Sequence, residues 1–287
     1  MTFQPYGNIL GGVYLVDGSS GNVTPLLDTG GTLKVSAKPY YADIAKGNVP
    51  GNTPWLKMGF NGALPANVEV DLAPFTSANY IFPATAQSMS MVSSSIYDGA
   101  TSAGIQSARI YYLNAAYVEA SVNVILAGTT SVNVGVGNIF RIQNIRASAV
   151  GSSMSAVGNI TLKNQANSLT YGYIQAGNTR QRSLIWTVPA NKNLYITSGV
   201  MSTVSGAKQA QVKFTLRATF DEKLGTTLTP GTFFMPYEEQ ILQDSALVHK
   251  LEMPAKFPAQ TDIKVTVKGD QAGAQASCIL DGWIEAV

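Results

Sequence analysis

Apolar and polar residues alternate strictly between Val212 and Phe220, where every second side chain is hydrophobic. A period of two places successive side chains on opposite faces of an extended chain, so this segment predicts a half-buried β-strand. The same pattern returns in further segments, which are residues 107–113, 118–126, 132–136, 139–145, 158–162, 184–188, 194–197, 247–251, 263–267 and 276–280. Because turn residues separate these segments, the pattern predicts an all-β protein with antiparallel sheets.

The predicted strands fall into two groups that meet near residues 164–171, where Asn, Gln and Ser interrupt the pattern. A length of 287 residues suits about two domains. We therefore expect two tandem antiparallel β-sandwiches of jelly-roll type, residues 61–165 and residues 166–287, with one larger sandwich as the alternative. Residues 236–245 begin with Pro and acidic residues, and they predict either a short helix or a long loop between strands.

Residues 1–60 are punctuated by Gly and Pro and contain only short apolar runs. We expect an extended N-terminal arm, which either clasps a neighbouring subunit or caps its own domain. Trp55 follows a proline in this arm and is predicted to be an exposed interface anchor, with the protein core and a sugar-binding platform as alternatives. Tyr40, Tyr41 and Phe60 complete the set of candidate interface residues.

Charged residues make up 13% of the chain, against about 25% in an average soluble protein. A surface poor in charge suits large contact areas, because burying charge is costly. Lys and Arg are scattered through the sequence and the net charge is +2, so we expect no nucleic-acid partner. No apolar run reaches about 18 residues and the N-terminus does not resemble a signal peptide, so we expect no membrane span and synthesis in a cytoplasm.

Few residues of the chain suit catalysis or metal binding. His249 is the only histidine and Cys278 the only cysteine, and the neighbours of Cys278 are those of a buried structural thiol. The acidic pairs at 221–222 and 238–239 are adjacent in sequence, and neighbours on one strand point to opposite faces rather than into one cleft. We predict no catalytic residue, no metal site and no cofactor, and therefore no enzyme; a polysaccharide hydrolase would need two carboxylates in one cleft.

Several short motifs, taken in order, resemble a known family. They are Gly47-Asn48-Val49-Pro50-Gly51, Gly59-Phe60-Asn61-Gly62, Tyr80-Ile81-Phe82-Pro83, Val92-Ser93-Ser94-Ser95 with Asp98, Leu126-Ala127-Gly128-Thr129-Thr130, Val157-Gly158-Asn159-Ile160-Thr161, Thr187-Val188-Pro189-Ala190-Asn191-Lys192-Asn193-Leu194-Tyr195-Ile196-Thr197 and Phe257-Pro258-Ala259-Gln260-Thr261-Asp262-Ile263-Lys264. Over residues 45–287 the ordered set resembles a family of tailed-bacteriophage virion structural proteins. Where members of that family have Gly in the turn after Pro189, this chain has Asn191, which tolerates the left-handed conformation.

The resemblance implies a virion component with no catalytic residues to carry over. We expect a head decoration (cement) protein that bridges and stabilises capsid subunits, with the major capsid protein as its partner. By analogy we also expect a homo-oligomer, and a trimer at local three-fold positions. The alternative is a tail, fibre or adaptor protein that attaches to the host, with a glycan as its ligand. In either role the protein acts in the virion after synthesis in the bacterial cytoplasm.

Overall fold

The computed structural model describes residues 14–16, 23–25, 40–74, 79–166, 168–204, 211–221, 225–227, 232–242 and 244–287. Within these ranges the regular elements are β-strands, apart from one short helix, α1 (Tyr40–Ala45). All pairs between named strands are antiparallel. The prediction of an all-β protein with antiparallel sheets is therefore confirmed.

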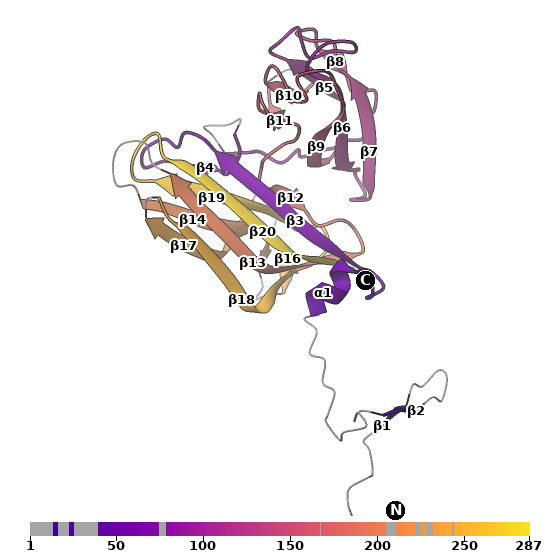
Figure 1. Ribbon diagram of the computed structural model, residues 1–287, viewed down its shortest axis with the longest axis vertical. Helices are drawn as coiled ribbons and strands as arrows, with labels where there is room; N and C mark the ends of the chain where they lie inside the picture. The colour runs from indigo at the N-terminus through magenta and orange to yellow at the C-terminus, as the bar shows by residue number, and fades with distance from the viewer. Residues whose placement is uncertain are drawn as a thin grey trace, which may run out of the picture.

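One group of strands forms the upper body in Figure 1, which we call the insert lobe. Its strands are β5 (Met89–Ser93), β6 (Ile105–Leu113), β7 (Glu119–Ile125), β8 (Val132–Asn133), β9 (Arg141–Val150), β10 (Ile160–Asn164) and β11 (Thr170–Ile174). They pair in two sheets, in the orders β11-β10-β5-β8 and β7-β6-β9. Side chains from both sheets, among them Met91, Ile110 and Leu162, form one buried core.

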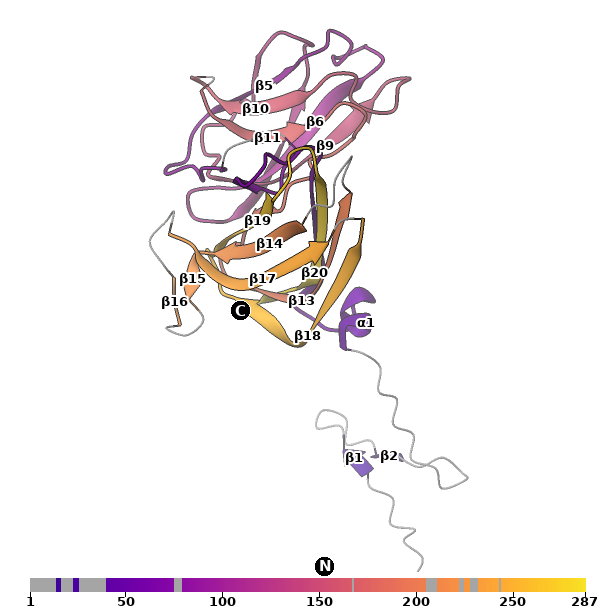
Figure 2. The same ribbon diagram turned by 90° about the vertical axis from the view of Figure 1, so that its left-hand side faces the viewer.

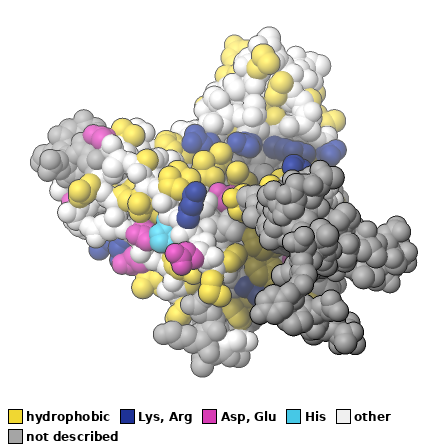
Figure 3. All heavy atoms as spheres, turned by 60° about the horizontal axis from the view of Figure 1, so that its bottom comes forward, with side chains coloured by type: hydrophobic (Ala, Val, Ile, Leu, Met, Phe, Trp, Pro, Cys, Tyr) yellow, Lys and Arg dark blue, Asp and Glu magenta, His cyan; other side chains and the backbone are white. Residues whose placement is uncertain are grey.

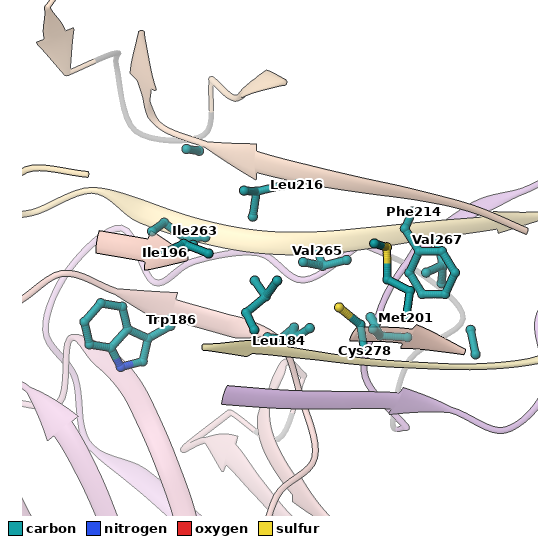
Figure 4. Close-up of a cluster of buried hydrophobic side chains, with 14 of the residues drawn as sticks. Leu184, Trp186, Ile196, Met201, Phe214, Leu216, Ile263, Val265, Val267 and Cys278 are labelled. Carbon is teal, nitrogen blue, oxygen red and sulfur yellow. The ribbon is translucent and has the colours of Figure 1, made fainter. Parts of the chain in front are cut away.

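The second group of strands forms the base lobe. Its strands are β3 (Asn52–Asn61), β4 (Glu69–Asp71), β12 (Ile185–Thr187), β13 (Lys192–Val204), β14 (Gln211–Ala218), β15 (Phe220–Asp221), β16 (Thr226–Thr227), β17 (Phe234–Leu242), β18 (Ala246–Phe257), β19 (Asp262–Gly269) and β20 (Gln275–Ala286). One sheet has the order β18-β13-β20-β3, and the other has the order β12-β19-β14-β17 with β4 paired to β19. Figure 4 shows side chains of both sheets meeting in one core, with Phe214 and Val265 from one sheet and Met201 and Cys278 from the other.

The two lobes do not follow one another along the chain. Strand β3 pairs over its whole length with the C-terminal strand β20, and β4 pairs with β19. The chain therefore begins the base lobe, builds the whole insert lobe between β4 and β12, and returns to complete the base lobe (Figures 1 and 2). This order differs from the expected domains at 61–165 and 166–287, because long-range pairing draws β3 and β4 into the C-terminal sheets. The jelly-roll strand order stays a prediction.

The expected arm, residues 1–60, contains regular structure. Its last ten residues belong largely to β3, and α1 packs beside β3 with Ile44 only 2% exposed. Strands β1 (Tyr14–Val16) and β2 (Val23–Pro25) pair with each other, while residues 1–13, 17–22 and 26–39 lie outside the described residues. The arm's role as a clasp on a neighbouring subunit stays a prediction.

Two local expectations can be compared directly with the structure. Residues 236–245, expected as a helix or a loop, instead supply most of β17, an edge strand of its sheet. Pro236 fits there because one side of an edge strand needs no backbone donor. Asn191 has a φ of 57°, so the left-handed conformation expected at this turn is confirmed.

One buried carboxylate holds the end of the insert lobe where loops 94–104 and 151–158 meet. Asp98 has no exposed surface, and its carboxylate accepts hydrogen bonds from Ser93 Oγ at 2.6 Å and from the backbone N–H of Ile105 at 2.9 Å. It also accepts from the N–H groups of Val157 at 3.0 Å and Gly158 at 2.8 Å. Both loops are therefore tied to one side chain, because a buried carboxylate needs all of these donors.

Candidate functional site

The two lobes meet around a buried ion pair, which we call the junction. Arg141 opens strand β9 of the insert lobe, and Asp262 opens strand β19 of the base lobe. Arg141 Nε lies 2.9 Å from Asp262 Oδ1 and Arg141 Nη2 lies 3.0 Å from Asp262 Oδ2, so the pair is bidentate. The two side chains are 2% and 4% exposed. Thr187 Oγ1 donates a further hydrogen bond to Asp262 Oδ1 at 2.6 Å.

Aromatic rings enclose the guanidinium of Arg141. Its central carbon lies 3.9 Å from the ring centre of Phe140, 5.3 Å from that of Phe82 and 5.8 Å from that of Tyr117. Arg141 Nη1 also donates to the carbonyl oxygen of Pro83. A desolvated cation held by a bidentate carboxylate and by ring faces is fixed in position, so Arg141 holds the two lobes at one relative orientation.

A second polar link crosses the junction from the edge strand β3. The ammonium of Lys57 donates to the backbone carbonyl of Gln143 in β9. The side-chain amide of Gln143 donates to the carbonyl of Thr187 at 2.6 Å and accepts the N–H of Thr187 at 3.2 Å. Lys57 makes no ion pair within the described residues, and burial lowers its pKa to about 7.

A cleft of about 630 Å³ opens beside the junction. Phe82, Phe140 and Phe233 supply aromatic walls, and Arg217 and Lys264 supply cationic groups. The ring of Phe233 lies tilted beside that of Phe82, with 5.8 Å between the ring centres, and Lys264 Nζ lies 5.0 Å from the centre of Phe233. The cleft is thus an aromatic recess with charges at its wall.

Acidic partners inside the base lobe balance the cations of the cleft. Arg217 Nε lies 2.8 Å from Glu69 Oε1, and Lys264 Nζ lies 2.9 Å from Asp71 Oδ1. Burial raises the pKa of Asp71, although Lys264 acts in the opposite direction. Burial would also raise the pKa of Glu69, but hydrogen bonds from Thr266 and Arg217 outweigh it and hold that pKa below its usual value. These pairs neutralise the wall of the cleft and fix its shape.

The structure places Trp55, the predicted interface anchor, in the core. Its side chain is 7% exposed and packs on Trp186 with 5.3 Å between ring centres. Strand alternation explains the difference, because the position of Trp55 in β3 points between the two base-lobe sheets. Trp55 was predicted to be an interface anchor, a core residue or part of a sugar-binding platform, and its burial supports the core position.

The other candidate interface residues do not form one cluster with Trp55. Tyr41 lies on α1 and is 64% exposed, whereas the side chain of Tyr40 lies outside the described part of the structure. Phe60 is half-buried on the outer side of β3, where the guanidinium of Arg182 lies 4.5 Å from its ring centre. Tyr41 and Phe60 therefore remain as surface candidates.

The residues considered for chemistry occupy structural positions. Cys278 is buried in the base-lobe core, as expected, and burial raises its pKa to about 12. His249 Nδ1 lies 2.9 Å from Glu239 Oε1, and both side chains are about a third exposed. Among the described residues no group of three or more His, Cys, Asp and Glu is arranged to hold a metal ion. The one helix described, α1, is too short to cross a membrane.

Sequence reasoning did not single out the residues that define the junction. Arg141 and Asp262 lie 121 positions apart, and no spacing rule connects them. The available signals were weak: Arg141 stands beside Phe140 in an uncharged stretch, and Asp262 belongs to one of the motifs on which the expected resemblance rests. Only the packing of the insert lobe on the base lobe brings them together.

Comparison with models of protein families and with curated proteins finds no match. Among solved structures, the chain is similar to that of infectious bursal disease virus Gx strain, with 10% identity over 83% of this chain and 77% of that chain and a TM-score of 0.21. It is also similar to the infectious bursal disease virus VP2 subviral particle, with 12% identity over 86% of this chain and 76% of that chain and a TM-score of 0.15. At such scores the likeness carries no argument about function.

Proposed function

We propose that the protein is a structural component of a tailed-phage virion, placed on the head as a decoration protein that bridges capsid subunits. The observation that carries this proposal is the junction, where a buried bidentate pair and a lysine–carbonyl hydrogen bond join two β-lobes into one unit. The charged groups of the junction are engaged in holding the lobes together. The resemblance of residues 45–287 to phage virion proteins supports the same role.

The proposed mechanism is the addition of buried area across contacts between capsid subunits. Such binding stabilises the assembled shell by mass action, because the protein binds the assembled form only. A unit whose lobes are already fixed loses little conformational freedom when it binds, so more of its contact energy stabilises the shell. The proposed partner is the major capsid protein, and a trimer at local three-fold positions is the proposed state.

The test is the stability of phage heads with and without the protein. Heads assembled without it are expected to release DNA at a lower temperature, and the purified protein is expected to restore the original temperature when added back. Heads of unchanged thermal stability would contradict the head role.

The N-terminal segment gives a more specific test of attachment. Removal of residues 1–39 stops before α1, so Ile44 and both lobes are kept. If this segment clasps a neighbouring subunit, the shortened protein folds, with an unchanged circular dichroism spectrum, but no longer joins heads. Full incorporation of the shortened protein would refute the clasp.

A second candidate function is attachment to a host glycan from a tail or fibre. The aromatic cleft beside the junction favours it, because sugar rings pack on aromatic faces next to balanced polar groups. The test is a glycan array with the whole protein and with Phe233→Ala, using the exposed Tyr97→Ala as the control. Binding that is lost only in Phe233→Ala supports this function, and an array without signal removes it.

A further inference from the structure

Four arginines that are scattered in the sequence converge on one surface. Arg109 of β6 lies directly opposite Arg146 of β9, and Arg146 lies opposite Arg180 in the following segment. Arg182 is two residues further along, with its guanidinium over the ring of Phe60 in β3 of the base lobe. We call Arg109, Arg146, Arg180 and Arg182 the arginine row. On the face shown in Figure 3, dark-blue basic side chains form a row where the two lobes meet.

The arginine row has no acidic partner in the part of the chain that the structure describes. None of its four side chains makes an ion pair within the described residues. Three of them contact neutral groups: Arg182 lies over Phe60, Arg146 contacts Tyr111 with 4.7 Å from guanidinium carbon to ring centre, and Arg180 Nη2 lies 3.3 Å from the sulfur of Met58. Like charges placed directly opposite on neighbouring strands are destabilising, so the arginine row lowers the stability of the free protein.

An apolar surface adjoins the arginine row on the base lobe. Val248, Val200, Ile279 and Met58 are consecutive cross-strand partners in the sheet β18-β13-β20-β3. Val248 is 56% exposed and the other three are half-buried on the outer side of that sheet. We call these four residues the apolar ladder. Arg180 contacts the last of them, Met58, so the apolar ladder adjoins the arginine row. Yellow hydrophobic side chains lie beside the dark-blue row in Figure 3.

The spacing and the neighbours indicate what such a surface fits. Residues directly opposite on adjacent strands are about 5 Å apart, which is close to the separation of side chains at i and i+4 on a helix. Phosphate chains are recognised by cations without an apolar ladder, whereas protein interfaces combine an apolar centre with a charged rim. We propose that the arginine row and the apolar ladder together dock an acidic segment of a partner protein, whose carboxylates repeat about every 5 Å beside apolar side chains.

The docking proposal adds the chemistry of the partner to the structural role proposed above. It rests on that role only for the identity of the partner protein. A peptide-binding measurement tests the face itself. Loss of the virion role would leave the result of that measurement unchanged, so the two proposals can fail separately.

The experiment measures fluorescence anisotropy of a labelled helical peptide of about 20 residues, with Glu at every fourth position and Leu beside each Glu. The full chain is expected to bind this peptide at low salt, to bind it more weakly as salt is raised, and not to bind a peptide with Gln in place of Glu. The variant Arg146→Gln/Arg180→Gln is expected to weaken binding about tenfold or more.

Controls separate the docking face from general charge and from unfolding. Lys163→Gln/Lys268→Gln removes the same charge from other sheets, and it is expected to bind like the unmodified chain. A thermal melt of each variant checks folding, and the arginine variant is expected to be no less stable because like-charge repulsion is relieved. Absent peptide binding, equal loss in the lysine variant, or tighter binding of a single-stranded DNA of similar length would each overturn the proposal.

Discussion

The guanidinium of Arg141 and the carboxylate of Asp262 form a bidentate ion pair at 2.9 and 3.0 Å, although 121 residues separate them in the chain. One belongs to the insert lobe and the other to the base lobe, and both are almost fully buried. The pair therefore joins the two lobes into one body, and its removal should destabilise the protein.

Arg141→Met is expected to lower the free energy of unfolding by about 3–5 kcal/mol, because it leaves the carboxylate of Asp262 buried without its counter-ion. Chemical denaturation measures this change. The matched control is Lys213→Met, which breaks the pair with Glu238 at 3.0 Å between side chains that are more than a third exposed. The control is expected to cost less than about 1 kcal/mol. Equal losses in both variants would contradict the account of the junction.

Lys57 gives the junction a defined pH dependence. Its pKa in the folded protein is about 7, below the ordinary value of 10.5, because burial disfavours the charged form. Below pH 7 Lys57 is charged in both the folded and the unfolded state, so the folded state carries the full cost of burying a charge. Between pH 7 and 10.5 the unfolded state binds more protons than the folded state, so the free energy of unfolding rises with pH.

The measurement compares the unmodified chain with Lys57→Met by urea denaturation between about pH 6 and pH 9. Above pH 7 the free energy of unfolding of the unmodified chain is expected to rise, relative to that of the variant, by up to about 1.4 kcal/mol per pH unit. Other titrating groups are common to both proteins and cancel in the difference. Two parallel curves would show that Lys57 keeps its ordinary pKa.

Trp55 is expected to act as a core residue. Trp55→Ala should lower the free energy of unfolding by about 3–5 kcal/mol, because it opens a cavity beside Trp186. Trp55→Phe, which keeps an aromatic ring, should cost less. The exposed Tyr41→Ala should change stability by less than about 0.5 kcal/mol. Thermal melts of the three variants check the order, and a Trp55→Ala variant as stable as Tyr41→Ala would place Trp55 on the surface after all.

Asp98 is expected to hold both loops at its end of the insert lobe. Asp98→Ala removes the acceptor of three backbone N–H groups and one hydroxyl, at a cost of about 3 kcal/mol or more. Ser93→Ala removes only one of these bonds and should cost about 1 kcal/mol. Limited proteolysis should cut the Asp98→Ala variant within residues 94–104 or 151–158 first. Cleavage elsewhere, with these loops intact, would contradict the role of Asp98 in holding both loops.

Local patterns in the sequence predicted the strands well, because alternation records which side of a sheet each residue faces. The segment from Val212 to Phe220 forms most of β14 and the start of β15. Pro236 and the acidic residues after it predicted a helix or a loop, but pairing with β14 made them an edge strand. Local propensity is a weak prior where tertiary pairing competes with it.

The candidate site depended on information that no local pattern holds. The prolines and glycines before Asn61 indicated an arm, whereas β3 is stabilised by β20 at the other end of the chain. The same long-range pairing buries Trp55 and places Lys57 against strand β9 of the insert lobe. The packing of the insert lobe on the base lobe brings Arg141 to Asp262. Arginines 109, 146 and 180 were correctly described as scattered in sequence, and only the register of the strands aligns them.

The central claim is that this two-lobed body is a structural part of a phage head. Electron microscopy of purified virions tests it most directly, by fitting the two lobes into density outside the capsid shell. The account predicts repeated density of this shape that bridges neighbouring capsid subunits. Density of this shape confined to the tail, or absent from the virion, would contradict it.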